Sequence, residues 1–214
     1  MPDKAKHLTL TIAFLLAIVA LSAGLFVSQH MHAKKKIDAS QLYGTLLDEP
    51  RAVEPFSFTG IDHKSFNNAS LQGTWTMMFF GFTNCGYMCP TTMAELGKMY
   101  RLLQEKGVKK LPQVVMVSVD PERDDLNKLS HYVKAFDVHF YGARGSEDAI
   151  KAMTHEMGIA YLKVARKDSD DSNNYDIEHT GSVMLFNPRG ELVAFFTSPH
   201  QAEMLAKDYM LLVA

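Results

Sequence analysis

Cysteine is scarce in this protein. Its 214 residues contain two cysteines, Cys85 and Cys89, which stand close together in the sequence. This spacing excludes the disulfide framework that holds small extracellular domains together, because such a framework needs several cysteines distributed along the chain. The two sulfurs of this protein instead lie within a single turn.

A strong charge of either sign is also missing. The formal net charge is −2 at pH 7, and the sequence has neither a basic face nor an RNA-binding motif. Nucleic-acid partners require clustered positive charge for their phosphates, so we expect no nucleic-acid partner. The sequence has no internal repeat, and 47% of its residues are hydrophobic. This composition predicts one globular domain with an additional apolar segment.

The additional apolar segment covers residues 8–27. Apart from small or hydroxyl-bearing residues it is apolar, and its roughly twenty residues match the thickness of a bilayer core. We therefore predict a transmembrane anchor at residues 8–27, preceded by a short tail at residues 1–7. A cleaved signal peptide is the alternative, since small-residue sites lie at residues 20–24, but the apolar run continues beyond them to Val27.

Lysines on both sides of this segment leave its orientation open. Lys4 and Lys6 precede it, and residues 34–36 are three lysines that follow it. The positive-inside rule therefore does not favour a cytoplasmic amino terminus. The region before the segment lacks the Arg- and Ser-rich pattern of a mitochondrial transit peptide, which favours a bacterial protein. Residues 28–51 are interpreted as a linker, and residues 52–214 as the globular domain.

The globular domain alternates strand and helix patterns. Its most continuous apolar run, residues 75–82, predicts a strand covered on both faces, and residues 91–104 follow as a helix. Further strands are expected at residues 56–59, 113–119, 138–141, 159–165, 182–187 and 191–197, further helices from residues 120 and 146 and after Ser198, and a polar loop at 166–176. Ser198 and Pro199 have the residue types of a helix cap and first helical position. The pattern predicts an α/β fold with a mixed sheet and helices on both faces.

The two cysteines stand where the apolar strand ends and a helix begins. Unpaired amide groups and the helix dipole at such a point favour the thiolate over the thiol. Thiolates are the nucleophiles of disulfide chemistry and the ligands of soft metals. With three residues between them, the sulfurs of Cys85 and Cys89 can either join or bind one ion together. The alternative is two buried cysteines acting as small hydrophobic side chains.

Several stretches of the sequence resemble the Sco/SenC family. The matching residues are 80–85, 89–93, 117–124, His179 and 185–190, which together span most of the chain after about residue 55. The chain departs from the family at Gly86, because the family commonly has proline after the first cysteine. Glycine at this position loosens the backbone of the loop.

The resemblance implies a thioredoxin-like, membrane-anchored protein with its globular domain outside the cytoplasm. It implies that copper, as Cu(I) or also as Cu(II), is bound by Cys85, Cys89 and His179 and delivered to a subunit of cytochrome c oxidase during assembly. An upstream copper donor or a thiol reductant would be a second partner. The expected location is the bacterial inner membrane, crossed once, with the globular domain in the periplasm.

Two thiolates and one imidazole would form a three-coordinate site. Soft sulfur selects Cu(I), and imidazole tolerates both copper oxidation states, whereas structural zinc requires four protein ligands. The alternative function is a thiol–disulfide oxidoreductase, in which the more exposed Cys85 attacks a partner disulfide and Cys89 resolves the intermediate. Copper retention should require His179, and disulfide exchange should not.

Other polar and sulfur-containing residues receive weaker roles. His131, His139, His155 and His200 are predicted to lie on the surface or around the site. Residues 120–124 form an acidic cluster that is either a docking surface, a layer around the copper ligands or an acid-rich helix start. Methionines at apolar-periodic positions are expected to fill the core, namely Met77, Met78, Met93, Met99 and Met116.

Overall fold

The computed structural model describes residues 14–22, 24, 39–165 and 175–213. The chain divides into two compact units, residues 1–37 and residues 38–214. In the first unit, residues 14–22 are helical. Among the residues that the structure describes, no helix has both the length and the apolar character needed to cross a membrane. The rest of the predicted anchor, the predicted tail and the first part of the predicted linker lie outside those residues.

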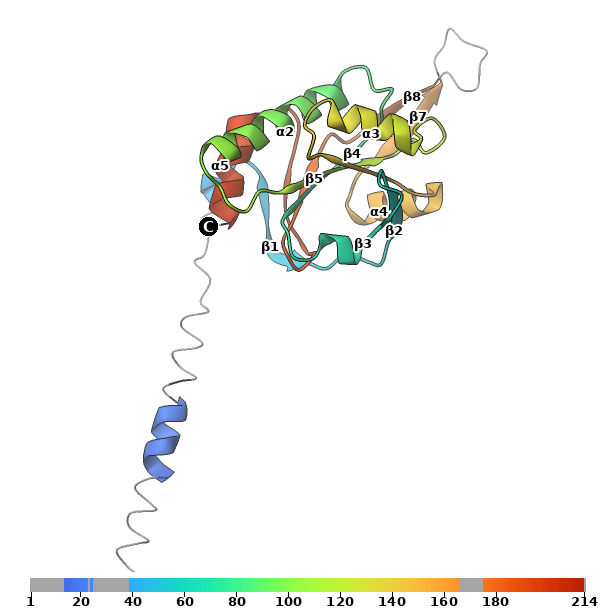
Figure 1. The fold of residues 1–214 in the computed structure, drawn as a ribbon. Coiled ribbons are helices and arrows are strands. Elements are labelled where there is room, and N and C mark those ends of the chain that lie inside the picture. The colour runs from blue at the N-terminus through green and yellow to red at the C-terminus, as the bar shows by residue number, and fades with distance from the viewer. Residues whose placement is uncertain (1–13, 23, 25–38, 166–174, 214) are drawn as a thin grey trace, which may run out of the picture. The chain divides into compact units, whose positions relative to one another are not determined.

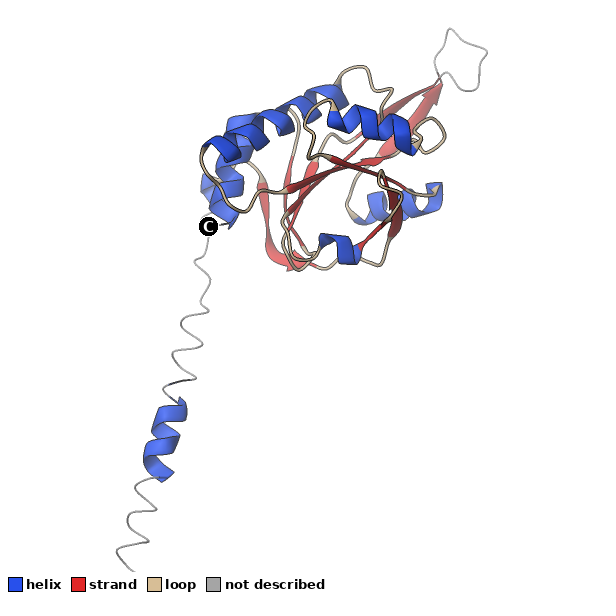
Figure 2. Ribbon diagram, in the orientation of Figure 1, coloured by secondary structure: helices blue, strands red, loops and turns tan. Residues whose placement is uncertain are grey.

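A mixed sheet forms the centre of the second unit (Figures 1 and 2). Its strand order is β1-β10-β9-β4-β5-β6-β2-β3, with β4, β5 and β6 parallel to one another and the other neighbours antiparallel. The strands are β1 (Thr45–Arg51), β2 (Ser57–Gly60), β3 (Ser65–Asn67), β4 (Thr76–Gly81), β5 (Gln113–Ser118), β6 (Tyr141–Arg144), β9 (Val183–Phe186) and β10 (Leu192–Phe196). The parallel crossover predicted between β4 and β5 is confirmed.

Helices flank this sheet, and a separate hairpin extends from it. The helices are α2 (Met88–Glu105), α3 (Leu126–Lys134), α4 (Glu147–Glu156) and α5 (Ala202–Val213), with short 3-10 turns at η1 (Ala39–Gln41) and η2 (Asn68–Leu71). Helices α2 and α5 pack against each other. Strands β7 (Tyr161–Ala165) and β8 (Tyr175–His179) form a two-stranded antiparallel sheet of their own, which projects from the main sheet in Figure 1. The predicted thioredoxin-like α/β fold is confirmed.

Strand β4 is the centre of the hydrophobic core. All six of its residues are buried, as expected for a strand covered on both faces. The prediction that methionines fill the core is also confirmed. Five of them are fully buried, namely Met77, Met78, Met93, Met99 and Met116. Because β4 cannot move without disturbing both of its faces, the loop that follows it starts from a rigid support.

The linker predicted at residues 28–51 is wrong over its last part. Residues 45–51 form β1, an edge strand that pairs with β10, and Leu46 and Leu47 pack against the core. The carboxylate of Asp208 in α5 also accepts hydrogen bonds from the amides of Tyr43 and Gly44, at 2.7 and 2.8 Å. The sequence around Pro50 resembles a turn, and only the exposed edge of β10 makes this segment a strand.

Three other elements begin clearly later than predicted. The helix expected from residue 120 begins at Leu126, because the side chain of Asp125 caps it by accepting from the amide of Lys128. The strand expected at residues 138–141 is β6, which begins only at Tyr141. The last helix begins at Ala202 instead of Pro199, and its first amide donates to a carboxylate oxygen of Glu95. Only at the last of these three boundaries does the contact come from another element, since Glu95 belongs to α2.

Candidate metal site

The two cysteines lie at the junction of β4 and α2. Cys85 lies in the loop between them, and Cys89 is the second residue of α2. The helix therefore begins three residues earlier than the predicted start at residue 91, and its first turn contains one of the two sulfurs. Cys89 is fully buried, whereas Cys85 is partly exposed. This difference agrees with the prediction that Cys85 is the more accessible of the pair.

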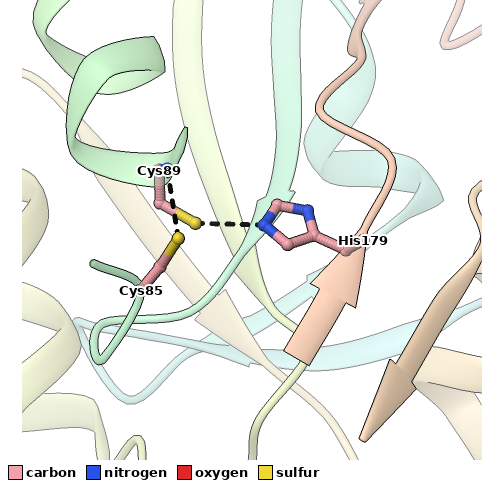
Figure 3. Close-up of side chains that lie close together, drawn as sticks. All are labelled: Cys85, Cys89 and His179. Atoms are coloured by element: carbon pink, nitrogen blue, oxygen red, sulfur yellow. Dashed lines mark hydrogen bonds between the residues drawn. The ribbon is translucent and has the colours of Figure 1, made fainter. Parts of the chain in front are cut away.

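His179 ends strand β8 and reaches the cysteines from the other side (Figure 3). Its Nε2 lies 3.2 Å from Sγ of Cys89, and the amide of Cys89 donates to Sγ of Cys85 over 3.3 Å. One ligand atom from each of the three residues lies within 4.8 Å of the others. In the described part of the chain, this is the one group of His, Cys, Asp or Glu side chains with the spacing to hold an ion.

Two phenylalanines hold the imidazole of His179 in place. The ring centroids of Phe79 and Phe82 each lie 5.8 Å from that of His179, and the ring of Phe82 meets it edge to face. Nδ1 of His179 lies 3.3 Å from the carbonyl oxygen of Thr180. A carbonyl can only accept, so Nδ1 can donate to Thr180, and Nε2 is the ring nitrogen that faces Cys89.

The two thiols have opposite acidities. The hydrogen bond from the side chain of Cys89 is the largest influence on Cys85 and lowers the pKa of its thiol to about 4, with a smaller contribution from His179, while partial burial acts in the opposite direction. The pKa of Cys89 is raised well above its usual value by the same hydrogen bond, by burial and by the negative charge of Cys85. At neutral pH the pair therefore holds one thiolate and one thiol.

The donor set fits a single soft metal ion. Two sulfurs and an imidazole nitrogen converge from two different elements, and one sulfur is already ionised. Soft thiolate ligands favour soft ions, and three protein ligands leave a side open for exchange. A shallow hollow of about 310 Å³ lies against His179 and is lined by residues of β7 and β8, including the exposed Leu162. The metal-binding role of these three residues itself remains a prediction.

The acidic cluster at residues 120–124 is not a helix start. Asp120 and Asp124 are fully buried, and the first turn of α3 contains no acidic residue. Asp124 instead accepts from the amide of Thr83, two residues before Cys85, at 3.0 Å. The sequence did not indicate this contact, because Thr83 follows β4 and Asp124 follows β5, and the two residues are far apart in the chain. The only available signal was the position of both segments after adjacent buried strands.

None of the four histidines given weaker roles, all of them among the described residues, joins the site. His131, His139 and His155 are exposed. His200 is buried, and its Nε2 lies 2.6 Å from the carbonyl oxygen of Gly181. Burial lowers the pKa of His200, so that its neutral form is favoured. His200 therefore supports the segment after His179 without reaching the cysteines.

Comparison with known proteins agrees with this fold. The SCO1/SenC family profile matches residues 45–213. The chain is 34% identical over 152 residues to the Arabidopsis thaliana protein named "Protein SCO1 homolog 1, mitochondrial", a match that covers 71% of this chain and 44% of that protein. This chain thus spans less than half the length of that relative.

Solved structures show the same fold. The copper-bound structure of Bradyrhizobium japonicum ScoI is similar, with a TM-score of 0.64, 30% identity and coverage of 74% of this chain and 98% of that one. BsSco, described as a disulfide-switch member of the Sco family of cytochrome c oxidase assembly proteins, has a TM-score of 0.59, 23% identity and coverage of 78% and 96%. Since the family profile covers almost the whole globular unit, this chain belongs to the SCO1/SenC family.

Proposed function

We propose that this protein binds copper through Cys85, Cys89 and His179 and delivers it to the copper site of a cytochrome c oxidase subunit during assembly. The observation that carries this proposal is the convergence of three ligand atoms within 4.8 Å from two separate elements. The copper in the structure of the Bradyrhizobium relative and the oxidase assembly role named for BsSco support it. Copper is here the cargo of the protein.

Each of the three residues contributes a different property. Cys85 is a thiolate at neutral pH and is partly exposed, so an incoming ligand of the acceptor can approach the ion on this side. Cys89 releases its proton when it becomes a ligand. His179 would bind through Nε2, and imidazole binds copper in either oxidation state. Ligand exchange at the open side then transfers the ion.

A thiol–disulfide oxidoreductase is the second candidate, and the acidity of Cys85 favours it. The thiolate of Cys85 would attack a partner disulfide, forming a mixed disulfide and releasing one partner thiolate. Cys89 would then lose its proton and attack the sulfur of Cys85, releasing the second partner thiol. The partner gains two electrons and the Cys85–Cys89 disulfide remains. An external thiol reductant would restore the dithiol.

The proposed location rests on the family of the chain and on the apolar segment at residues 8–27. We propose a single-pass anchor at residues 8–27 in a bacterial inner membrane, with the globular unit in the periplasm, where a copper donor or thiol reductant would reach it. Protease added to spheroplasts should then degrade residues 38–214 while leaving cytoplasmic proteins intact. Recovery of the undegraded chain from spheroplasts whose inner membrane is sealed would reject this topology.

The decisive experiment measures copper retention. Residues 38–214, which form a compact unit, are reduced, loaded with Cu(I) without oxygen and dialysed against a chelator. We expect the wild-type unit to retain about one copper per chain and the His179→Ala variant to lose it. His155→Ala is the matched control, because this exposed histidine lies outside the site.

Two outcomes would count against copper delivery. Full copper loading in a Cys85→Ser variant would reject the proposed ligand set. Loss of copper from the wild-type unit itself would leave the oxidoreductase as the better function, and disulfide exchange independent of His179 would then support it.

A further inference from the structure

Residues 120–124 follow β5 and carry two fully buried carboxylates. Asp120 and Asp124 are both inaccessible to solvent. A buried carboxylate is costly unless charged or hydrogen-bonding groups compensate it. Asp124 has a partner just before Cys85, and Asp120 has a partner in the strand of His179. The segment therefore contacts both of the elements that supply ligands.

Asp124 contacts the element that carries the cysteines. Its carboxylate accepts hydrogen bonds from the amide of Thr83 at 3.0 Å, from the hydroxyl of Thr83 at 2.5 Å and from the hydroxyl of Ser118 at 2.7 Å. Thr83 lies two residues before Cys85, and Ser118 ends β5. Hydrogen bonds to an ionised carboxylate are short and strong. Asp124 thus ties the start of the cysteine loop to the end of the neighbouring strand.

Arg123 contacts the element that carries the histidine. Its Nη1 donates to the carbonyl oxygen of Tyr175 over 2.8 Å, and its guanidinium lies 3.6 Å from the centroid of the Tyr175 ring. Asp120 completes this group, because it accepts from Nε of Arg123 at 2.5 Å and from the hydroxyl of Tyr175 at 2.6 Å. Tyr175 is the first residue of β8, and His179 is its last.

Strand β8 needs such a support. Within the described residues it pairs only with β7, and this hairpin makes no backbone ladder with the main sheet. Side-chain contacts, together with the short link from His179 to the start of β9 at Val183, therefore determine where β8 lies relative to α2. The guanidinium of Arg123 also lies 5.9 Å from the ring of Phe82, which contacts the imidazole of His179.

We propose that residues 120–124 are a two-armed positioning element, in which Asp124 holds the loop of Cys85 and Arg123 holds the strand of His179. The element sets the separation between Cys89 and His179 and thereby the geometry of the three ligands. This inference rests on the proposed function, since that separation matters only if the residues share one ion. Neither Asp124 nor Arg123 is one of the three candidate ligands.

The two arms should fail in different ways. Arg123→Lys keeps a positive charge for Asp120 but loses the planar group that stacks on Tyr175. We expect the Cu(I) affinity of this variant to fall about tenfold, as for other residues that orient metal ligands. The Cu(II) form should lose the imidazole nitrogen coupling in its electron paramagnetic resonance spectrum. The redox equilibrium of Cys85 and Cys89 with glutathione should stay unchanged.

Asp124→Asn should show the opposite pattern. Loosening the loop lowers the tendency of Cys85 to meet Cys89, so the equilibrium with glutathione should shift about tenfold toward the dithiol, which is about 30 mV for a two-electron couple. The Cu(I) affinity should again fall about tenfold, but the imidazole nitrogen coupling should remain. A purely structural effect on stability would instead change both signals together.

Two control variants match these changes. Asp125→Asn removes the same charge one residue later, and asparagine caps α3 as well as aspartate does. Arg101→Lys makes the arginine replacement on the exposed face of α2. All variants are made in the full chain, and thermal unfolding confirms that each is folded before copper is added.

Measurements without copper separate this inference from the proposed function. The glutathione equilibrium tests the cysteine arm, and the nuclear magnetic resonance shifts of the His179 ring test the histidine arm, which should respond to Arg123→Lys and not to Asp124→Asn. A wild-type chain that binds no copper would reject the proposed function while these two signals still test the arms. The two-armed element would be overturned if each variant behaved like its control. It would also be overturned if Arg123→Lys and Asp124→Asn each changed the glutathione equilibrium and the His179 ring shifts together.

Discussion

The amide of Cys89 donates a hydrogen bond to the sulfur of Cys85 over 3.3 Å. This contact, together with the side-chain hydrogen bond between the same residues, divides the pair into an acidic thiol and a weakly acidic one. The sequence indicated a thiolate because of the helix start. In the structure, the main cause of the lowered pKa of Cys85 is instead its hydrogen bond with Cys89. Removal of Cys89 should therefore change the reactivity of Cys85.

Alkylation of the reduced protein should report the acidity of Cys85. The thiolate is the reactive form, so the rate at Cys85 should rise through a midpoint near pH 4, its lowered pKa, and stay nearly constant at neutral pH. Cys89→Ala removes the principal hydrogen-bond donor and should move the midpoint upward. Mass spectrometry of iodoacetamide-treated protein measures this profile. A midpoint at the ordinary cysteine value of about 8.5 would contradict it.

Gly81 should not tolerate a side chain. A Cβ atom at this position would lie 2.6 Å from Cε1 of Phe79 and 3.0 Å from Sγ of Cys89. Gly81→Ala should therefore cost about 1–3 kcal/mol of unfolding free energy and weaken copper retention, because Phe79 and Cys89 must move. Urea denaturation and chelator competition measure the two effects.

Gly86→Ala is the matched control for this substitution. No atom lies within 4 Å of its added Cβ, and its φ is not among the positive values of the chain. The variant should keep its copper and gain about 0.4–1 kcal/mol, because alanine restricts the unfolded chain. Equal losses of stability and copper retention in the Gly81 and Gly86 variants would show that close packing at Gly81 does not cause the effect of Gly81→Ala.

Asp208 should stabilise the start of the globular unit. Its fully buried carboxylate accepts from the amides of Tyr43 and Gly44. Asp208→Ala would leave both amides without their acceptor and should lower the unfolding free energy by about 2–4 kcal/mol. Asp208→Asn keeps one acceptor oxygen and should lower the unfolding free energy by less. Chemical denaturation of both variants tests this order, and an alanine variant as stable as the asparagine variant would contradict it.

Removal of residues before position 52 should destabilise the protein. A chain of residues 52–214 lacks β1, so one edge of β10 loses its partner and becomes open to pairing with other chains. We expect a lower melting temperature and concentration-dependent association compared with residues 38–214. Calorimetry and gel filtration measure these properties. Identical melting temperatures for the two chains would mean that β1 contributes nothing to the fold.

Local patterns in the sequence were sufficient for much of the fold. The apolar run from Trp75 to Phe82 predicted the central strand, and the turn after it placed Cys85 and Cys89 within reach of each other. The periodic positions of Met93 and Met99 predicted which face of α2 is buried. These features depend on residues within one or two turns of each other, so the sequence alone determines them.

The tertiary structure decided the contacts between distant segments. His179 lies 90 residues beyond Cys89 in the chain, and without the family resemblance no periodicity would select it among the histidines. Local patterns also did not reveal β1, which is a strand only because β10 offers an edge, or the contacts of Asp124, whose partners lie at or just beyond the ends of two neighbouring strands. Strand order and hairpin position determine such contacts. They arise from packing over the whole domain, which no short stretch of sequence specifies.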